Sequence, residues 1–100
     1  MKEFKGTPGP WVADKTSRAI GPISRDDDQS YGILIPVAWV EFETEVEIQA
    51  SNQNLIAAAP ELLEALQFIN NAINHGTQMD IVKGQEMAES AINKALGEKQ

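Results

Sequence analysis

The stretch NQNLIAAAPELLEAL, residues 52–66, decides how the C-terminal half of this chain folds. Its apolar residues recur every three or four positions, as on one face of an α-helix, and this spacing continues to Ile73. Pro60 interrupts the pattern, because proline lacks the N–H that a helix interior needs and disfavours helical dihedrals at Ala59. We therefore expect one helix to end near Ala58 and a second to begin with Pro60 at its first position, so that the chain bends there.

Two further signals predict the ends of the helices. Thr44 is followed three residues later by Glu47, which is the spacing of a capping box, and we expect the first helix to begin after Thr44. The alternating glutamates of residues 41–47 are also compatible with a half-exposed strand, and that alternative stays open. Gly76 is expected to end the second helix, and a last helix is predicted over residues 80–96.

The N-terminal part has the pattern of short strands. The turn GTPGPW, residues 6–11, is followed by apolar residues that begin a short strand. The strongest strand signal is YGILIPVAWVEF, residues 31–42, where Ile33, Leu34 and Ile35 in a row predict burial on both faces. Pro36 places this segment at a sheet edge, at a bulge, or between two strands. Trp39 is expected to anchor the core, the commoner fate of tryptophan in a small domain.

These elements predict an α+β fold in a single domain of residues 1–100. The strand-rich part is expected over residues 1–43, as a small antiparallel sheet of about three or four short strands. The helical part is expected over residues 44–100, as two or three helices with the bend at Pro60. A domain of this size buries a modest share of its surface, so oligomerisation is expected.

Composition excludes several functional classes. The chain has a net charge of −7 and no basic cluster, which disfavours binding to duplex nucleic acid. It has no apolar run of the length needed to span a membrane and no signal peptide, so a cytosolic location is predicted. The absence of cysteine excludes thiol nucleophiles and disulfides.

The sequence carries no pattern of catalytic or metal-binding residues. His75 is the single histidine, and one histidine with scattered carboxylates does not make a zinc site. The acidic run of residues 26–28 lacks the spacing of a calcium loop and is expected to be an exposed tip. We therefore predict a protein that is not an enzyme and that uses no cofactor and no metal.

Several residues could bind an anionic ligand. Trp11 follows a proline-rich turn and could stack on a nucleobase or anchor the core. Lys15, Arg18 and Arg25 supply positive charge in the N-terminal third, where a phosphate is expected to bind. Asn52 falls on the inner stripe of its helix, so its amide is expected to bond to backbone or, as the alternative, to face a ligand.

The apolar stripe of the helices is expected to form the core or an interface between copies of the chain. The residues predicted for the oligomer interface are Leu62, Leu66, Ile69, Ile73 and Ile92.

The motifs TPGPW (residues 7–11), Asn52 and LIAAAPELLEAL (residues 55–66) resemble those of a widespread family of small proteins encoded by tailed phages and prophages. The resemblance covers most of the chain. It implies a phage accessory protein that acts in the host bacterial cytosol. Among phage accessory proteins, the anti-Thoeris sponges have a similar plan, with an N-terminal sheet and C-terminal helices.

The similarity in plan implies a counter-defence function in which a homo-oligomer sequesters a cyclic ADP-ribose-type signal or a cyclic oligonucleotide. A pocket at a subunit interface is then expected. An alternative is an acidic inhibitor or modulator of a host or defence protein, acting through residues 26–28 or 41–47. This alternative predicts an exposed apolar patch rimmed by acids. A third possibility is a structural accessory oligomer.

Overall fold

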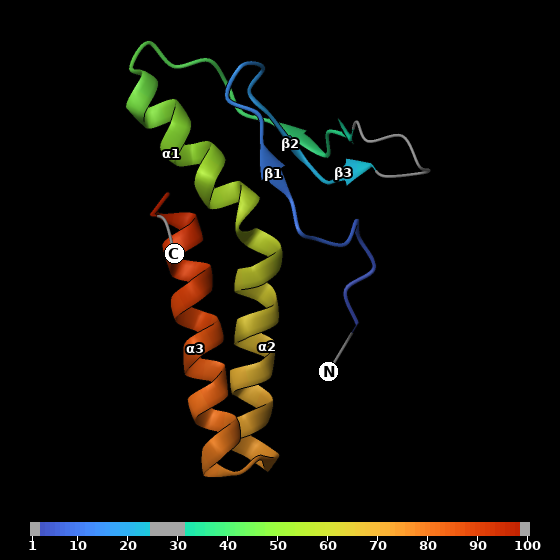
Figure 1. Ribbon diagram of the computed structural model, residues 1–100, viewed down its shortest axis with the longest axis vertical. Coiled ribbons are helices and arrows are strands. Elements are labelled where there is room, and N and C mark those ends of the chain that lie inside the picture. Colours follow the sequence, from blue (N-terminus) through green and yellow to red (C-terminus); the bar gives the residue numbers. More distant parts are fainter. Residues whose placement is uncertain (1–2, 25–31, 99–100) are drawn as a thin grey trace.

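A computed structural model describes residues 3–24 and 32–98 of the chain (Figure 1). Arg25 and the acidic run of residues 26–28 lie outside the described residues. Within the described part, five short strands precede three helices, which confirms the predicted α+β fold. The elements are β1 (Val12–Ala13), β2 (Ala19–Gly21), β3 (Ile23–Ser24), β4 (Ile33–Leu34), β5 (Ala38–Trp39), α1 (Val46–Ala57), α2 (Ala59–His75) and α3 (Gln78–Ala95).

The strands form two small antiparallel sheets. β2 lies between β1 and β5 in one sheet, while β3 and β4 pair in the other. Ile20 pairs with Ala13 and with Ala38, and its side chain is fully buried on the side of α1. Because neighbouring residues in a strand point to opposite faces, Trp39, which pairs with Ala19, lies on the other face.

The core at the junction of the sheet and α1 is small. Ile20, Val40 and Ala57 form its buried centre, and the partly buried Trp11 and Ile56 pack against them. Ala13 completes the partly buried set. The sheet therefore rests on α1 mainly through Ile20.

The burial predicted for Ile33, Ile35 and Trp39 is wrong. The side chains of Ile33 and Ile35 are 71% and 51% exposed, and Trp39 is 64% exposed rather than a core anchor. Pro36 divides the segment into two strands, one of the three alternatives for that residue. Each of these strands is only two residues long. Trp39 lies on the face of its sheet opposite to Ile20 and α1, and most of its side chain is exposed there.

The bend at Pro60 is present (Figure 1). α1 ends at Ala57, and Pro60 is the second residue of α2, one position later than predicted, because Ala59 already has helical geometry. The N-terminal turn packs onto this corner: a Cβ added at Gly9 would lie 2.6 Å from Cβ of Pro60. The two motifs TPGPW and LIAAAPELLEAL therefore meet in space, and glycine is required where they touch.

The predicted capping box at the start of α1 is wrong. The N-cap is Glu45, and its side chain makes no capping hydrogen bond. Thr44 precedes the N-cap position, so its hydroxyl is not placed to cap the first turn. A capping box occurs instead at α3, where the backbone N–H of Asp80 donates to Thr77 Oγ1 and that of Thr77 donates to Asp80 Oδ2.

α2 and α3 run side by side in opposite directions (Figure 1). Their contact is made by small residues, with Ala65 and Ala72 of α2 and Gly84 and Ala91 of α3 all buried. A Cβ added at Gly84 would lie 2.7 Å from Cγ1 of Ile69, so the two helices are closely packed at this point.

Candidate functional site

Among the predicted ligand-binding residues that the structure describes, two lie together. Trp11 and Lys15 line one pocket of about 240 Å³, together with Asn54 and Lys94 from the helices. Arg18 is not among the residues that line it. This volume is slightly below the range of about 300–1,000 Å³ that is typical of small-molecule sites.

Part of the positive charge that lines the Trp11 pocket is already paired within the chain. Lys94 Nζ donates to the carbonyl oxygen of Trp11 at 3.0 Å and pairs with Glu61 Oε2 at 3.0 Å. The indole N–H of Trp11 donates to the Thr7 carbonyl at 3.3 Å. Lys94 is therefore engaged within the chain. The exposed Lys15 is the other lysine of the lining, and its positive charge is the one that a small anion would meet.

Lys15 lies in a turn organised by Asp14. The Asp14 carboxylate accepts hydrogen bonds from Thr16 N at 3.0 Å, Thr16 Oγ1 at 2.8 Å and Ser17 Oγ at 2.8 Å. The Thr16 backbone N–H, then the Ser17 and Thr16 hydroxyls, hold the pKa of Asp14 below its ordinary value, because they stabilise the ionised form.

The predicted role of Asn52 falls on its neighbour. Asn52 is exposed, whereas Gln53 is 3% exposed. Gln53 Nε2 donates to the Asp14 carbonyl at 2.9 Å and to the Ala19 carbonyl at 3.5 Å, so the buried amide binds backbone at the junction of the sheet and α1. The helical stripe drawn from residues 52–66 is displaced by one residue in α1, because the helix bends at Pro60 and the two halves present different faces.

Arg18 holds the backbone that follows β5. It has a positive φ of 63°, which is uncommon for a residue other than glycine. Its carbonyl accepts from Val40 N at 3.0 Å, and its Nη1 donates to the Val40 carbonyl at 3.4 Å. Arg18 is therefore engaged by the segment that leads to α1.

That segment carries several large exposed apolar side chains. Trp39 and Phe42 are each 64% exposed and Val46 is 76% exposed. Four exposed glutamates alternate with them in sequence. We call these residues together the acidic–apolar surface: Trp39, Glu41, Phe42, Glu43, Glu45, Val46 and Glu47.

A second hydrogen bond shapes the loop of the acidic–apolar surface. The backbone N–H of Glu43 donates to Gln49 Oε1 at 3.1 Å, which ties the loop to the first turn of α1. The loop is thus held at Val40 by Arg18 and at Glu43 by Gln49. Its large apolar side chains are presented to solvent from a backbone that has fixed partners.

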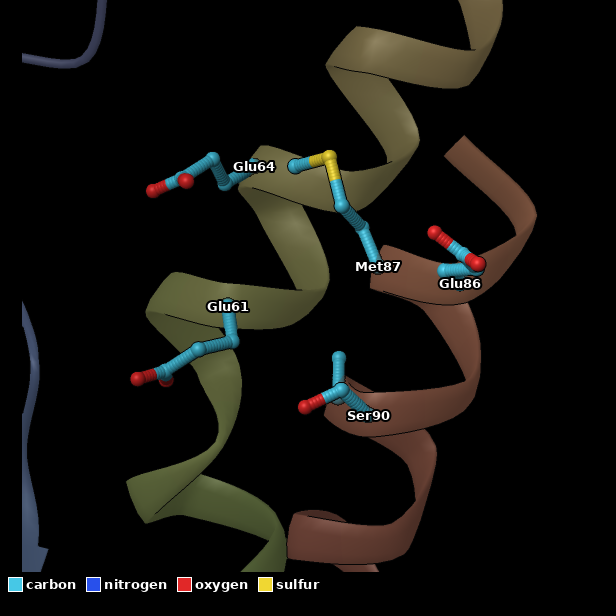
Figure 2. A pocket seen from close by; sticks show the side chains of 6 residues that line it. Glu61, Glu64, Glu86, Met87 and Ser90 are labelled. Carbon is cyan, nitrogen blue, oxygen red and sulfur yellow. The ribbon is translucent and has the colours of Figure 1, made fainter. Parts of the chain in front are cut away.

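An acidic pocket of about 320 Å³ lies between α2 and α3 (Figure 2). Glu61 and Glu64 extend from α2 on the same side, and Glu86, Met87 and Ser90 come from α3. This lining suits a cation and opposes a phosphate. The described residues contain no group of three or more His, Asp or Glu side chains arranged to hold a metal ion.

The residues predicted for an oligomer interface differ in burial. Leu66 and Ile73 are each 65% exposed and Ile92 is 48% exposed, whereas Leu62 and Ile69 are partly buried. None of the described helices is long and apolar enough to cross a membrane.

Sequence reasoning missed three residues that shape these sites. Lys94 has no motif around it, and only the fold places it beside Trp11, 83 residues away in sequence. Gln53 was missed because the helical stripe was assigned to its neighbour Asn52. Phe42 could have been recognised, since it belongs to the alternating apolar and acidic pattern of residues 39–47.

A family model described as Salmonella phage P22 protein Y8K6 matches residues 1–99. Neither a curated protein nor a solved structure matches the chain. The match spans both the N-terminal turn and the helices that pack on it, as the resemblance to phage proteins implied. The chain therefore belongs to the family of the Salmonella phage P22 protein Y8K6, a family of small phage-encoded proteins.

Proposed function

We propose that this chain is a non-enzymatic phage protein that binds a host protein through the acidic–apolar surface and modulates it. The observation that carries the proposal is the exposure of Trp39, Phe42 and Val46 within one short segment. Contiguous apolar exposure rimmed by polar residues is typical of a contact surface, and tryptophan is enriched among the residues that dominate binding energy.

The charge of this surface indicates the chemistry of the partner. Its four glutamates stand in a chain whose net charge is already −7, so acidic partners are repelled and basic ones attracted. The complementary surface is a protein patch with an apolar hollow for Trp39 and a rim of lysine or arginine. The exposed apolar side chains of this segment, with glutamates between them in sequence, support the inhibitor alternative.

The shape of the loop favours binding as well. Hydrogen bonds from Arg18 and to Gln49 hold its backbone at Val40 and at Glu43. A surface that is ordered before association loses less conformational entropy when it binds.

The test compares capture of host proteins by the native chain, by Trp39→Ser and by Met79→Ser. Met79 is 80% exposed, so Met79→Ser removes a similarly exposed apolar side chain from α3, away from this surface. We expect the native chain and Met79→Ser to retain the same host protein. Trp39→Ser should bind it about 30-fold more weakly, the loss expected for an interface hot spot of about 2 kcal/mol.

The captured protein is then purified and its association rate measured at several salt concentrations. Replacing the four glutamates of residues 41–47 by glutamine should lower the association rate and flatten its salt dependence. Equal binding of one partner by the native chain and by Trp39→Ser would contradict the proposal.

A second candidate function is sequestration of a small nucleotide signal by a homo-oligomer. The observation that favours it is the shared pocket of Trp11 and Lys15, which combines a stacking surface with a cation. Cyclic ADP-ribose and a cyclic dinucleotide are the probes, and the shift in unfolding temperature is the measurement. A specific ligand at a hundredfold excess over its Kd stabilises the fold by about 2.7 kcal/mol, and Lys15→Gln should reduce that shift.

A further inference from the structure

The two sides of the pair formed by α2 and α3 differ in chemistry. On one side, Lys94 pairs with Glu61 at 3.0 Å, and Lys83 Nζ lies 5.6 Å from the ring centroid of Phe68. We call this side the charged flank. Its residues are Glu61, Glu64 and Phe68 of α2 and Lys83, Met87 and Lys94 of α3.

The N-terminal segment lies against the charged flank. Phe4 lines a pocket with Glu64 and Phe68, and a second pocket with Pro60 and Leu63. Phe4 therefore lies close to the α2 part of this flank. Figure 1 shows the N-terminal segment running beside α2.

The other side of the same helix pair is apolar. In α2, residues at spacings of four, three and four form one stripe on the far side of the line of Ala65 and Ala72. The facing stripe of α3 lies on the far side of Gly84 and Ala91. We call this side the apolar flank, and its residues are Leu62, Leu66, Ile69, Ile73, Ile81, Ala88 and Ile92, with Gln85 as an uncharged polar residue in the α3 stripe.

We propose that the apolar flank binds the same flank of a second copy, so that two helix pairs form a symmetric four-helix dimer. The flank carries no charged residue, whereas every charged residue of α2 lies on other faces of that helix. For a chain of net charge −7, self-association through a charged face is repulsive, so the uncharged flank is the face that a second copy can use. A self-complementary apolar face is what a two-fold interface requires.

The accessible surface of the chain also supports a partner. It measures 7686 Å². A compact monomer of 10.9 kDa is expected to expose about 5,600 Å². Part of this excess lies in the sheet region, where Ile33 and Trp39 are exposed, and part lies on the helix pair. On the apolar flank, Leu66 and Ile73 are each 65% exposed, so a second copy has large side chains to cover.

The test is the mass of the full chain in solution over a range of protein concentrations, measured by sedimentation or light scattering. The native chain should shift from 10.9 kDa at low concentration to twice that mass at high concentration. The double variant Leu66→Glu/Ile73→Glu should stay at 10.9 kDa, or dimerise at least 100-fold more weakly. Both side chains are mostly exposed, so its helical circular dichroism should match the native signal.

Met79→Glu/Val82→Glu is the matched control. It adds the same charge at exposed apolar residues of α3 that lie outside the apolar flank, and it should dimerise like the native chain, apart from the general effect of the added charge. A native chain that stays at 10.9 kDa at every concentration overturns the proposal. Dimerisation of the flank variant to the same extent as the control overturns it too.

Cross-linking locates the interface independently. The native chain has no cysteine, so Leu66→Cys and Val82→Cys each carry a single thiol. A short bifunctional maleimide should link Leu66→Cys into covalent dimers and leave Val82→Cys monomeric. Equal cross-linking of the two variants contradicts the proposed face. The outcome is separable from host-protein binding, because Trp39→Ser leaves the apolar flank unchanged and should dimerise normally.

Discussion

The junction of the sheet with α1 and the contact between α2 and α3 are packed by residues of different size. At the junction of the sheet and α1, the fully buried Ile20 and the 3% exposed Gln53 fill and bridge the space between elements. Between α2 and α3, the contact is made by small residues such as Ala65, Ala72 and Gly84. The large apolar residues of the helix pair are left on its sides.

This difference decides how each region responds to substitution. The sheet junction is filled by a large buried side chain, so removing atoms from that side chain should destabilise it. The helix pair is closely packed because the contact residues are small, so adding atoms to those residues should destabilise it. The comparison also explains why a strongly apolar helical stripe provides so little core: alanine and glycine occupy the contact line, and leucine and isoleucine flank it.

The largest effect is expected from Ile20→Ala. Ile20 is the largest fully buried side chain of the described residues, and its truncation should lower the free energy of unfolding by about 2–5 kcal/mol. Urea unfolding followed by tryptophan fluorescence, which reports on Trp11 and Trp39, measures the loss. If helical circular dichroism falls at the same urea concentration as fluorescence, the two regions unfold together; a helical signal that persists shows that they are separable. A loss below about 1 kcal/mol would contradict the role given to Ile20.

Gly84→Leu tests the helix pair from the opposite direction. A Cβ at Gly84 already falls within 2.7 Å of Ile69, so a larger side chain forces the helices apart and should cost about 1–3 kcal/mol. The same substitution at the exposed Glu86, on a face of α3 away from the apolar flank, should leave the free energy of unfolding nearly unchanged. Similar stabilities of the two variants would show that close packing at Gly84 is not required.

Gln53→Met removes the buried amide while keeping most of its volume. Loss of the hydrogen bonds to the Asp14 and Ala19 carbonyls should cost about 1–2 kcal/mol, less than the cavity at Ile20, because both carbonyls keep a second donor. Asn52→Met, at an exposed position, is the matched control and should change stability little. Equal losses in the two variants would mean that the amide has no structural role.

Local patterns predicted the order of the elements because each signal acts within a few residues. Helical spacing and Pro60 predicted the position of the bend, and proline and glycine residues predicted the turns between strands. Burial was predicted less well, since it depends on which elements meet. The run Ile33–Ile35 has the pattern of a buried strand, but its strand does not lie against a helix, so Ile33 and Ile35 are exposed.

The candidate sites were predictable only in part for the same reason. Trp11 and Lys15 share a pocket because they are close in sequence, whereas the contribution of Lys94 comes from a contact between distant segments. Arg18 has the charge of a ligand-binding residue, but its guanidinium donates to the Val40 carbonyl. Its role in shaping the acidic–apolar surface follows from geometry that the residue type does not reveal.

The smallest effect concerns Asp14. Its pKa is lowered in the folded chain by hydrogen bonds from Thr16 and Ser17, so the ionised form stabilises the fold above the unfolded-state pKa. That contribution is lost as pH falls below about 4 and through the folded-state pKa. Asp14→Asn should therefore lower the urea midpoint slightly at pH 7, and the difference from the native chain should shrink toward zero in acid. A difference that stays constant with pH would show that the carboxylate charge is not what organises the turn. Because Asp14 also offers its carbonyl to Gln53, the effect should be seen by tryptophan fluorescence and leave the contact between α2 and α3 unchanged.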